Sequence, residues 1–271
     1  MGSLRGDVRD NSRDSLRGGS WDGLDKPRAA ATAPPSRFLA SNQEVANLEV
    51  SNPEVSNPEV SNPEVSNLEA TNLEVMYPIV ETFYSVQGEG YWTGQSAFFI
   101  RLGGCDVGCT WCDTKHSWEA DRHPQRSVRD LVAEAAGVAS PRVIVTGGEP
   151  TLHDLRPLVL GLRGAGCSPH LETAGAHPLQ GEFDWVTLSP KPWRSPDPSI
   201  YSHVDELKVV VAEPADLDWA EAQASQVAPA TLKLLQPEWS SPEAKTLVYH
   251  YVLQHPDWRI SLQTHKFLKV R

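Results

Sequence analysis

The stretch RVIVTGGEP, residues 142–150, joins a short β-branched run to a turn with two adjacent glycines. Val, Ile and Thr favour an extended strand, and glycines at its end let the backbone approach a ligand closely. A helix is predicted through residues 158–162, with Pro157 in its first turn, and a strand at 170–173. The stretch therefore predicts a β-α-β unit with a ligand site at the carboxyl end of its first strand.

The alternation of strands and helices continues on both sides of this unit. Further strands are predicted at residues 95–102, 185–188, 206–211, 231–235 and 258–263. Helices are predicted at 128–138 with Ser127 as N-cap, at 217–227, and at 243–253 after Ser241-Pro242. Near-continuous apolar strands that alternate with helices are typical of a parallel sheet. Residues 76–271 are too few for a full eight-stranded barrel of roughly 250 residues, so we predict an α/β fold with a partial, open βα barrel of about six strands.

Composition changes sharply near residue 75. Residues 1–40 are rich in Gly, Ser, Arg, Asp and Pro, and residues 41–75 repeat a five-residue unit, clearest as EVSNPEVSNPEVSNPEVSN. Each unit offers little apolar surface to offset the entropy of ordering the chain. We therefore expect residues 1–75 to be a disordered low-complexity extension, with a docking tail as the alternative, and residues 76–271 to be the folded domain. Met1 and Met76 are the only methionines, and our hypothesis is that Met76 is the initiator or that everything before it is dispensable.

Charge and cysteine content exclude several classes of protein. The net charge of −11 and a pI near 5.3 argue against a general nucleic-acid or anionic-membrane surface. No run of about 18 apolar residues occurs, and the N-terminal residues lack the apolar core of a secretory signal. Four cysteines in 271 residues do not make a disulfide scaffold. We therefore expect a cytoplasmic protein whose thiols have a metal or redox role.

Three of the four cysteines lie in GCDVGCTWCDT, residues 104–114. Cys105, Cys109 and Cys112 offer three thiolates to one metal centre, whereas structural zinc takes four protein ligands. Cys167, in GAGCSPH, is interpreted as a small buried apolar residue. Three thiolates suit a [4Fe–4S] cluster with one iron left open. The alternative is a zinc site completed by His116 or by a distant residue.

The turn of residues 146–150, TGGEP, would be weak evidence alone because ordinary βα turns look similar. It follows the cysteines by about one βα unit, and this arrangement resembles the radical S-adenosylmethionine superfamily, with CxxxCxxC after the first barrel strand and a GGE-type motif after the second. The resemblance implies that the open iron receives the amino and carboxylate groups of S-adenosylmethionine.

A narrower resemblance covers residues 77–271. The segments ETFYSVQGEGYWTGQSAFFIRLGGC, CDT, TGGEPTL, ETAG, LSPKP, ELKVVV, LLQPE and LQTHKFLKVR look like the 7-carboxy-7-deazaguanine synthase family. This resemblance implies a radical lyase that converts 6-carboxy-5,6,7,8-tetrahydropterin to 7-carboxy-7-deazaguanine with loss of ammonia, in queuosine and 7-deazapurine biosynthesis. It also implies Mg²⁺ beside the substrate, an electron donor such as flavodoxin or ferredoxin, a homodimer, and neither a nucleic-acid nor a membrane partner.

The resemblance also implies a role for particular residues. Cys105, Cys109 and Cys112 would ligate the cluster, and Thr114 would bind Mg²⁺, whose hard octahedral shell prefers oxygen. Contacts to S-adenosylmethionine are expected from Trp111, Cys112, Asp113, Gly148, Ser189, Pro190, Lys191, Gln236, Pro237 and Glu238. The pterin pocket is expected to comprise Val86, Gln87, Gly88, Glu89, Arg101 and Thr146.

Several residues keep two interpretations. Arg101 could be a surface salt-bridge residue and Glu89 a simple turn residue, although together they suit a carboxylate and an amidine-like edge. Glu172 is a candidate cofactor contact, and His265 and Lys266 could face the site or only complete the fold. Trp92 and Trp118 are expected to pack rather than to stack on a ligand. The substrate pocket of the family also uses the carboxyl end of the chain. Here the chain ends in LKVR, and the arginine departs from the family's pattern.

Two other classes of protein remain open from the sequence. An activase that makes a glycyl radical on a partner protein shares the cluster loop but needs neither QGEG nor SPKP. A zinc-binding module explains three cysteines but not the TGGEP turn.

Overall fold

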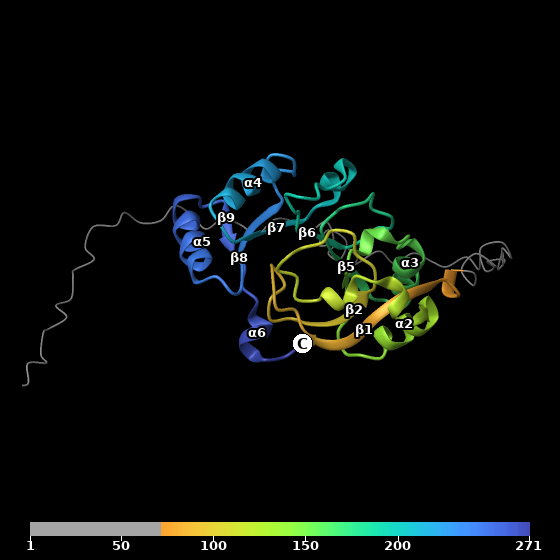
Figure 1. Ribbon diagram of the computed structural model, residues 1–271. Helices are drawn as coiled ribbons and strands as arrows, with labels where there is room; N and C mark the ends of the chain where they lie inside the picture. The colour runs from red at the N-terminus through yellow and green to blue at the C-terminus, as the bar shows by residue number, and fades with distance from the viewer. Residues whose placement is uncertain (1–71) are drawn as a thin grey trace, which may run out of the picture. The chain divides into compact units, whose positions relative to one another are not determined.

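In the computed structural model, which describes residues 72–271, the seven predicted strands and two that were not predicted, β1 and β3, form one sheet with the order β3-β1-β2-β4-β5-β6-β7-β8-β9. Residues 1–71, most of the expected extension, lie outside the described residues. The strands are β1 (Met76–Val86), β2 (Ser96–Leu102), β3 (Gln125–Ser127), β4 (Arg142–Gly147), β5 (Ser168–Thr173), β6 (Trp185–Leu188), β7 (Glu206–Val211), β8 (Leu232–Pro237) and β9 (Trp258–Ile260). Figure 1 labels β9, β8, β7, β6, β5, β2 and β1 in this order across the sheet.

The seven strands from β2 to β9 run parallel, which confirms the open α/β arrangement. The sheet is larger than the predicted barrel of about six strands, because its parallel part has seven strands and two antiparallel strands extend it. β1 pairs with β2 and β3 pairs with β1. Residues 76–86, MYPIVETFYSV, mix apolar and polar side chains without strict alternation. The sequence pattern therefore did not mark β1 as a strand.

Alternation along the parallel strands divides their side chains between two environments. Phe98, Ile100 and Leu102 of β2 join a buried core beneath α2 (Val128–Ala136) and α3 (Arg156–Gly164), whereas Phe99 and Arg101 face the opposite side. A second core lies beneath α4 (Ala215–Ala224) and α5 (Pro242–Gln254), against β7 and β8. Because successive strand residues point to opposite faces, every second residue is free to form a site.

The helices begin at the predicted caps. The Ser127 hydroxyl accepts a hydrogen bond from the Asp130 amide at 3.2 Å, and Ser241 accepts one from the Ala244 amide at 3.0 Å. The helix α6 (Thr264–Leu268) was not predicted, because a five-residue helix has too few positions for a periodic pattern. Within residues 72–271, no helix has the length and apolarity that a membrane crossing requires.

The segment between β1 and β2 closes the amino-terminal end of the parallel strands. The Tyr91 amide donates to the carboxylate of Glu206, at the start of β7, at 2.9 Å. Trp92 contacts the rings of His170 and Trp185, at the starts of β5 and β6. This packing role of Trp92 is the one predicted. Because β1 runs antiparallel to β2, the loop that joins them lies at the amino-terminal end of the parallel strands.

Residues 72–75, the end of the expected extension, contact the fold. Leu73 and Val75 pack against the core beneath α2 and α3. The Val75 carbonyl accepts a hydrogen bond from the Val128 amide at 2.9 Å, and Glu74 pairs with Arg129 at 2.5 Å.

We predict that a chain beginning at Met76 is less stable than one beginning at residue 72. It loses two partly buried apolar contacts and one backbone hydrogen bond, which together contribute roughly 1–3 kcal/mol. Thermal unfolding of the two chains measures the difference. Equal melting temperatures would show that the contacts of Leu73 and Val75 add nothing, and they would support dispensability of everything before Met76.

Candidate active site

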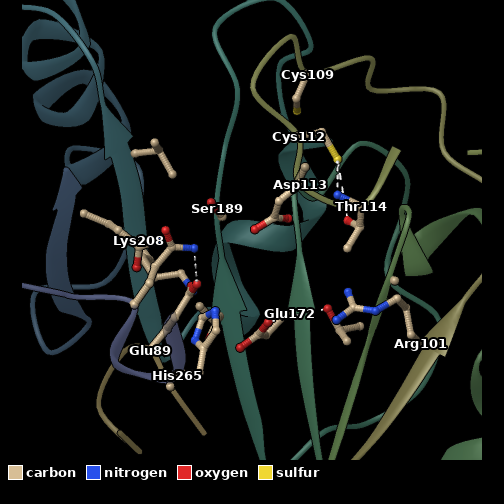
Figure 2. Close-up of a pocket in the computed structure, with 18 of the residues that line it drawn as sticks. Glu89, Arg101, Cys109, Cys112, Asp113, Thr114, Glu172, Ser189, Lys208 and His265 are labelled. Carbon is tan, nitrogen blue, oxygen red and sulfur yellow. Dashed lines mark hydrogen bonds and ion pairs between the residues drawn. The ribbon is translucent and has the colours of Figure 1, made fainter. Parts of the chain in front are cut away.

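A cavity of about 290 Å³ opens where the parallel strands end. Every residue predicted from the sequence to bind the cluster, the cofactor, magnesium or the pterin lines it, with the single exception of Pro190. The structure therefore brings together residues from the β1–β2 loop, the cysteine loop and the ends of β4, β6 and β8. Figure 2 shows Cys109 and Cys112 at one end of this cavity and Glu89, Lys208, His265 and Glu172 at the other.

The cysteine loop follows β2, and its backbone is anchored at both ends. The Gly104 amide donates to the Ser117 carbonyl at 2.7 Å, and the Cys105 amide donates to the Trp118 carbonyl at 3.1 Å. Gly104 and Gly108 adopt φ values of +101° and +70°, which L side chains rarely adopt. Gly104 and Gly108 therefore allow the backbone of the cysteine loop to adopt these turns.

The thiols fit a cluster with three cysteine ligands. Cys105, Cys109 and Cys112 are free and half-buried on the cavity wall, and burial raises the pKa of the Cys105 and Cys109 thiols. Within residues 72–271, no three His, Cys, Asp or Glu side chains converge tightly enough to hold one metal ion. A cluster with three cysteine ligands would take one thiolate on each of three irons.

The two residues considered as a fourth ligand lie elsewhere. Cys167 is buried in the core beneath α2 and α3, which confirms its interpretation as a small apolar residue. His116 is exposed on the short helix η1 (Lys115–Ser117) and does not line the cavity. Among the described residues, neither of these two residues therefore joins the three thiols as a fourth ligand, and the ligand set itself remains a prediction.

The Gly-Gly turn after β4 packs directly against the root of the cysteine loop. A Cβ atom at Gly148 would lie 2.1 Å from the Gly104 carbonyl oxygen, and one at Gly147 would lie 2.3 Å from the Leu102 carbonyl oxygen. The Gly148 amide donates to Leu102 at 2.9 Å, and the Glu149 amide donates to Gly104 at 2.8 Å. The glycines were expected to admit a ligand; they also let two loops join through their backbones.

Glu149 is a buried carboxylate that the sequence did not single out. Its side chain accepts hydrogen bonds from the amide and hydroxyl of Thr151 at 3.0 and 2.6 Å, from the Thr173 hydroxyl, and from the Ala174 amide at 2.8 Å. Only 1 % of the residue is exposed. Four donors satisfy a buried carboxylate, so Glu149 ties the end of β4 to the end of β5.

A second set of contacts holds the outer side of the cysteine loop. Asp106 accepts from His177 at 3.0 Å and from Arg194 at 2.8 Å. The Trp193 indole donates to the Val107 carbonyl at 2.9 Å. The loops after β5 and β6 thus fix the loop that carries the cysteines. These long-range partners have no signature in the sequence.

Lys191 lies between the cysteine loop and the end of β6. Its ammonium donates to the carbonyl and hydroxyl oxygens of Ser189, the latter at 2.8 Å, and lies 5.4 Å from the Trp111 ring. Burial lowers the pKa of Lys191 to about 8, although the Cys109 thiol acts in the opposite direction. At neutral pH the lysine is mostly protonated and can balance negative charge on the cysteine loop.

The floor of the cavity is built from carboxylates and amides. Glu89 accepts from the ammonium of Lys208 and from the Gln263 amide at 2.8 Å. Glu172 accepts from the Gln87 amide at 2.7 Å. The structure places Glu172, the candidate cofactor contact, on the floor of the cavity, and its role toward the cofactor remains a prediction. Lys208 was missed, although a lysine inside the apolar run ELKVVV is a signal that could have found it.

The pair of Glu89 and Lys208 stays charged. Burial alone would raise the pKa of Glu89, but the Lys208 ammonium outweighs burial and lowers this pKa to about 2. Burial alone would lower the pKa of Lys208, but the carboxylates of Glu89, Glu172 and Glu206 raise it above its ordinary value. Opposite charges in a buried site favour the ionised forms of each other.

Arg101 forms the side wall of the cavity, beside Glu172 (Figure 2). Its Nε donates to Glu81 at 3.0 Å, so one edge of the guanidinium is engaged. The other oxygen of Glu81 lies 3.1 Å from the Nη1 of Arg271, which also lines the cavity. Arg101 thus forms a salt bridge and faces the cavity as well, so its two interpretations are compatible.

The final segment of the described chain covers the cavity from one side. His265 packs on Gly88, where a Cβ would lie 2.1 Å from its Nδ1, and Lys266 pairs with Asp113 at 3.1 Å. Both side chains therefore face the site. Trp118 also lines the cavity, so its predicted packing role remains a prediction.

An open α/β barrel with three cysteines after its first parallel strand and a Gly-Gly-Glu-Pro turn after the next defines a radical S-adenosylmethionine enzyme. Over 197 residues the chain is 51 % identical to the 7-carboxy-7-deazaguanine synthase of Synechocystis, covering 73 % of this chain and 95 % of the relative. Identity to the Flavobacterium psychrophilum enzyme of that name is 45 % over 196 residues, covering 72 % and 93 %. The chain belongs to the 7-carboxy-7-deazaguanine synthase family.

A solved structure supports the assignment. The crystal structure of QueE from Escherichia coli matches with a TM-score of 0.64 and 34 % identity, covering 70 % of this chain and 95 % of that one. A search against models of protein families gave no match.

Proposed function

We propose that this chain converts 6-carboxy-5,6,7,8-tetrahydropterin to 7-carboxy-7-deazaguanine with loss of ammonia, the deazapurine-forming step of queuosine biosynthesis. The observation that carries the proposal is one cavity with two chemically different ends. Free thiols lie at one end, and the polar floor of Glu89, Glu172 and Lys208 lies at the other. Such a cavity holds a redox cofactor against a polar heterocycle.

The residues of the cysteine loop would hold the cluster through Cys105, Cys109 and Cys112. The contacts proposed for S-adenosylmethionine come from Trp111, Cys112, Asp113, Gly148, Ser189, Pro190, Lys191, Gln236, Pro237 and Glu238. When bound, the cluster and S-adenosylmethionine together supply the radical chemistry that removes hydrogen from the substrate. The protein fixes the loop through the Gly148 turn and through Asp106, and Phe83, Phe99 and Val210 contribute apolar surface to the cavity.

The pterin would lie across the floor of the cavity. Glu89 and Glu172 present carboxylate oxygens that accept hydrogen bonds from the N–H groups of an aminopyrimidine edge. Arg101 offers the guanidinium nitrogens that Glu81 leaves free, which suit the substrate carboxylate. Val86, Gln87, Gly88 and Thr146 would line the same pocket.

Magnesium is proposed at Thr114. The Thr114 hydroxyl lies 3.5 Å from the Cys112 sulfur and lines the cavity. One hydroxyl, together with substrate oxygens and water, suits a hard octahedral cation. We also propose a cytoplasmic location, a homodimer, and reduction of the cluster by a flavodoxin or ferredoxin.

Complementation tests the proposal. A bacterial strain that lacks its own 7-carboxy-7-deazaguanine synthase should regain queuosine in its tRNA when it expresses this chain. The matched strain that expresses Cys109→Ala should not regain it. If the wild-type chain accumulates in soluble form and tRNA still lacks queuosine, the proposed activity is wrong.

We expect Arg271→Ala to weaken substrate binding more than turnover. Arg271 is largely exposed and shares Glu81 with Arg101, so KM should rise about three- to tenfold with little change in kcat. The control is Arg259→Ala, an exposed arginine on β9 outside the cavity. Equal KM values for both variants would show that Arg271 does not contribute to substrate binding.

A further inference from the structure

Lys208 is a buried, charged residue of the cavity that is not among the proposed contacts to the cofactor. It lies in the middle of β7, within ELKVVV, and only 4 % of the residue is exposed. An unpaired ammonium at this depth would be strongly destabilising. Its neighbours Leu207 and Val209 point into the apolar core. The strand therefore directs one charged side chain into the cavity for a specific partner.

That partner is Glu89, on the loop that closes the opposite end of the barrel. The two side chains form an ion pair between elements 119 residues apart. The other charged and titratable groups around this pair come from several elements: Lys191 after β6 and His265 from α6 act on Glu89, and Glu206 from β7 and Glu172 from β5 act on Lys208. Lys208 is the cation in direct contact.

The pairing decides both the charge and the direction of Glu89. Its Oε2 atom is held by Lys208 and its Oε1 atom by Gln263 at 2.8 Å. Without the Lys208 ammonium, the carboxylates of Glu89 and Glu172 would both lie on the cavity floor with little positive charge to balance them. Like charges in a buried site favour protonation of one of the two groups. A protonated Glu89 would offer one acceptor fewer to a ligand.

We propose that Lys208 is a positioning residue that keeps Glu89 ionised and oriented to accept N–H groups of the bound pterin. The inference rests on the proposed function, because it concerns how that substrate is recognised. Lys208 acts through Glu89 and does not itself contact the substrate. The cost of removing Lys208 therefore depends on the presence of Glu89.

The first test is Lys208→Met, with Lys233→Met on β8 as the matched control outside the cavity. KM and kcat for 6-carboxytetrahydropterin are measured with the reconstituted enzyme from pH 6 to 8.5. Lys208→Met should raise KM at least about tenfold, with the larger rise at low pH, because Glu89 then titrates in this range. Wild type and Lys233→Met should lack this dependence.

The double variant Glu89→Gln/Lys208→Met tests whether Lys208 acts through Glu89. In the Glu89→Gln background, Lys208→Met should change KM by less than about threefold and should leave KM independent of pH. This neutral pair also keeps the test decisive if Lys208→Met folds poorly. An equal effect of Lys208→Met in both backgrounds would overturn the proposal.

Thermal unfolding gives a second readout that needs no activity. In wild type the lowered pKa of Glu89 stabilises the fold fully above its unfolded value of 4.5, and this contribution is lost progressively as the pH falls from there through about 2. In Lys208→Met the pKa of Glu89 is expected above its unfolded value, so the stability deficit of the variant should shrink between pH 8 and 5. A constant deficit would contradict the proposal, whereas absence of turnover in wild type would instead refute the proposed function.

Discussion

Cys109→Ala is expected to abolish the iron–sulfur cluster and to lower turnover below about one-thousandth of wild type, because the cofactor supplies the chemistry that the protein lacks. Cys109 is one of three free thiols on the cavity wall, and the only other cysteine in the described chain is buried in the core. No nearby thiol can therefore replace it. Iron and sulfide analysis, the visible absorption of the cluster and turnover of anaerobically reconstituted protein measure the effect.

Cys167→Ala is the matched control. Cys167 packs in the core beneath α2 and α3, so its loss should cost stability of the order of 1 kcal/mol and leave iron content unchanged. The opposite outcome, normal iron in Cys109→Ala or iron loss in Cys167→Ala, would mean that the ligands are wrongly assigned.

Gly148→Ala is expected to lower turnover by about a hundredfold or more, because displacement of reacting groups by about 1 Å can have that effect. An added methyl group would lie 2.1 Å from the Gly104 carbonyl oxygen and 2.9 Å from the Cys105 Cβ. The neighbour is backbone and cannot rotate away. The turn and the start of the cysteine loop must therefore move apart. This movement displaces the thiols relative to the opposite end of the cavity.

Gly164→Ala serves as the control for this substitution. Gly164 is the last residue of α3, and an added Cβ there meets nothing within 4 Å. Alanine in a helix is favoured over glycine by up to about 1 kcal/mol, so this variant should be active and equally or more stable. Initial rates, cluster content and unfolding temperatures of both variants are compared. Full activity of Gly148→Ala would show that the contact between the two loops is dispensable.

The sequence predicted the parallel half of the sheet because its strands are buried on both faces. Runs such as RVIVT and ELKVVV are mostly apolar and rich in β-branched residues, and the caps at Ser127 and Ser241 mark helix starts. β1 carries mixed polarity, so periodicity did not mark it. α6 is held against the QGEG loop, where the Thr264 amide donates to the Gly88 carbonyl at 2.8 Å. Such a contact exists only after folding.

The residues of the candidate site also fall into two groups, those that the sequence could identify and those that it could not. Residues with a local motif, such as the three cysteines and the Gly-Gly turn, were found from spacing and resemblance. Lys208 and Glu149 act through partners distant in sequence, Glu89 and Thr173 respectively. No spacing rule connects such pairs, so the folded arrangement is needed to identify them. The roles of the lining residues toward cofactor and substrate remain predictions.

The most direct test is anaerobic turnover by the reconstituted protein, supplied with S-adenosylmethionine, Mg²⁺, a reductant and 6-carboxy-5,6,7,8-tetrahydropterin. Products are identified by mass. Formation of 7-carboxy-7-deazaguanine by wild type and not by Cys109→Ala is the result we predict. Release of 5′-deoxyadenosine without the deazapurine, from protein with full iron content, would contradict the assigned substrate while leaving the radical chemistry in place.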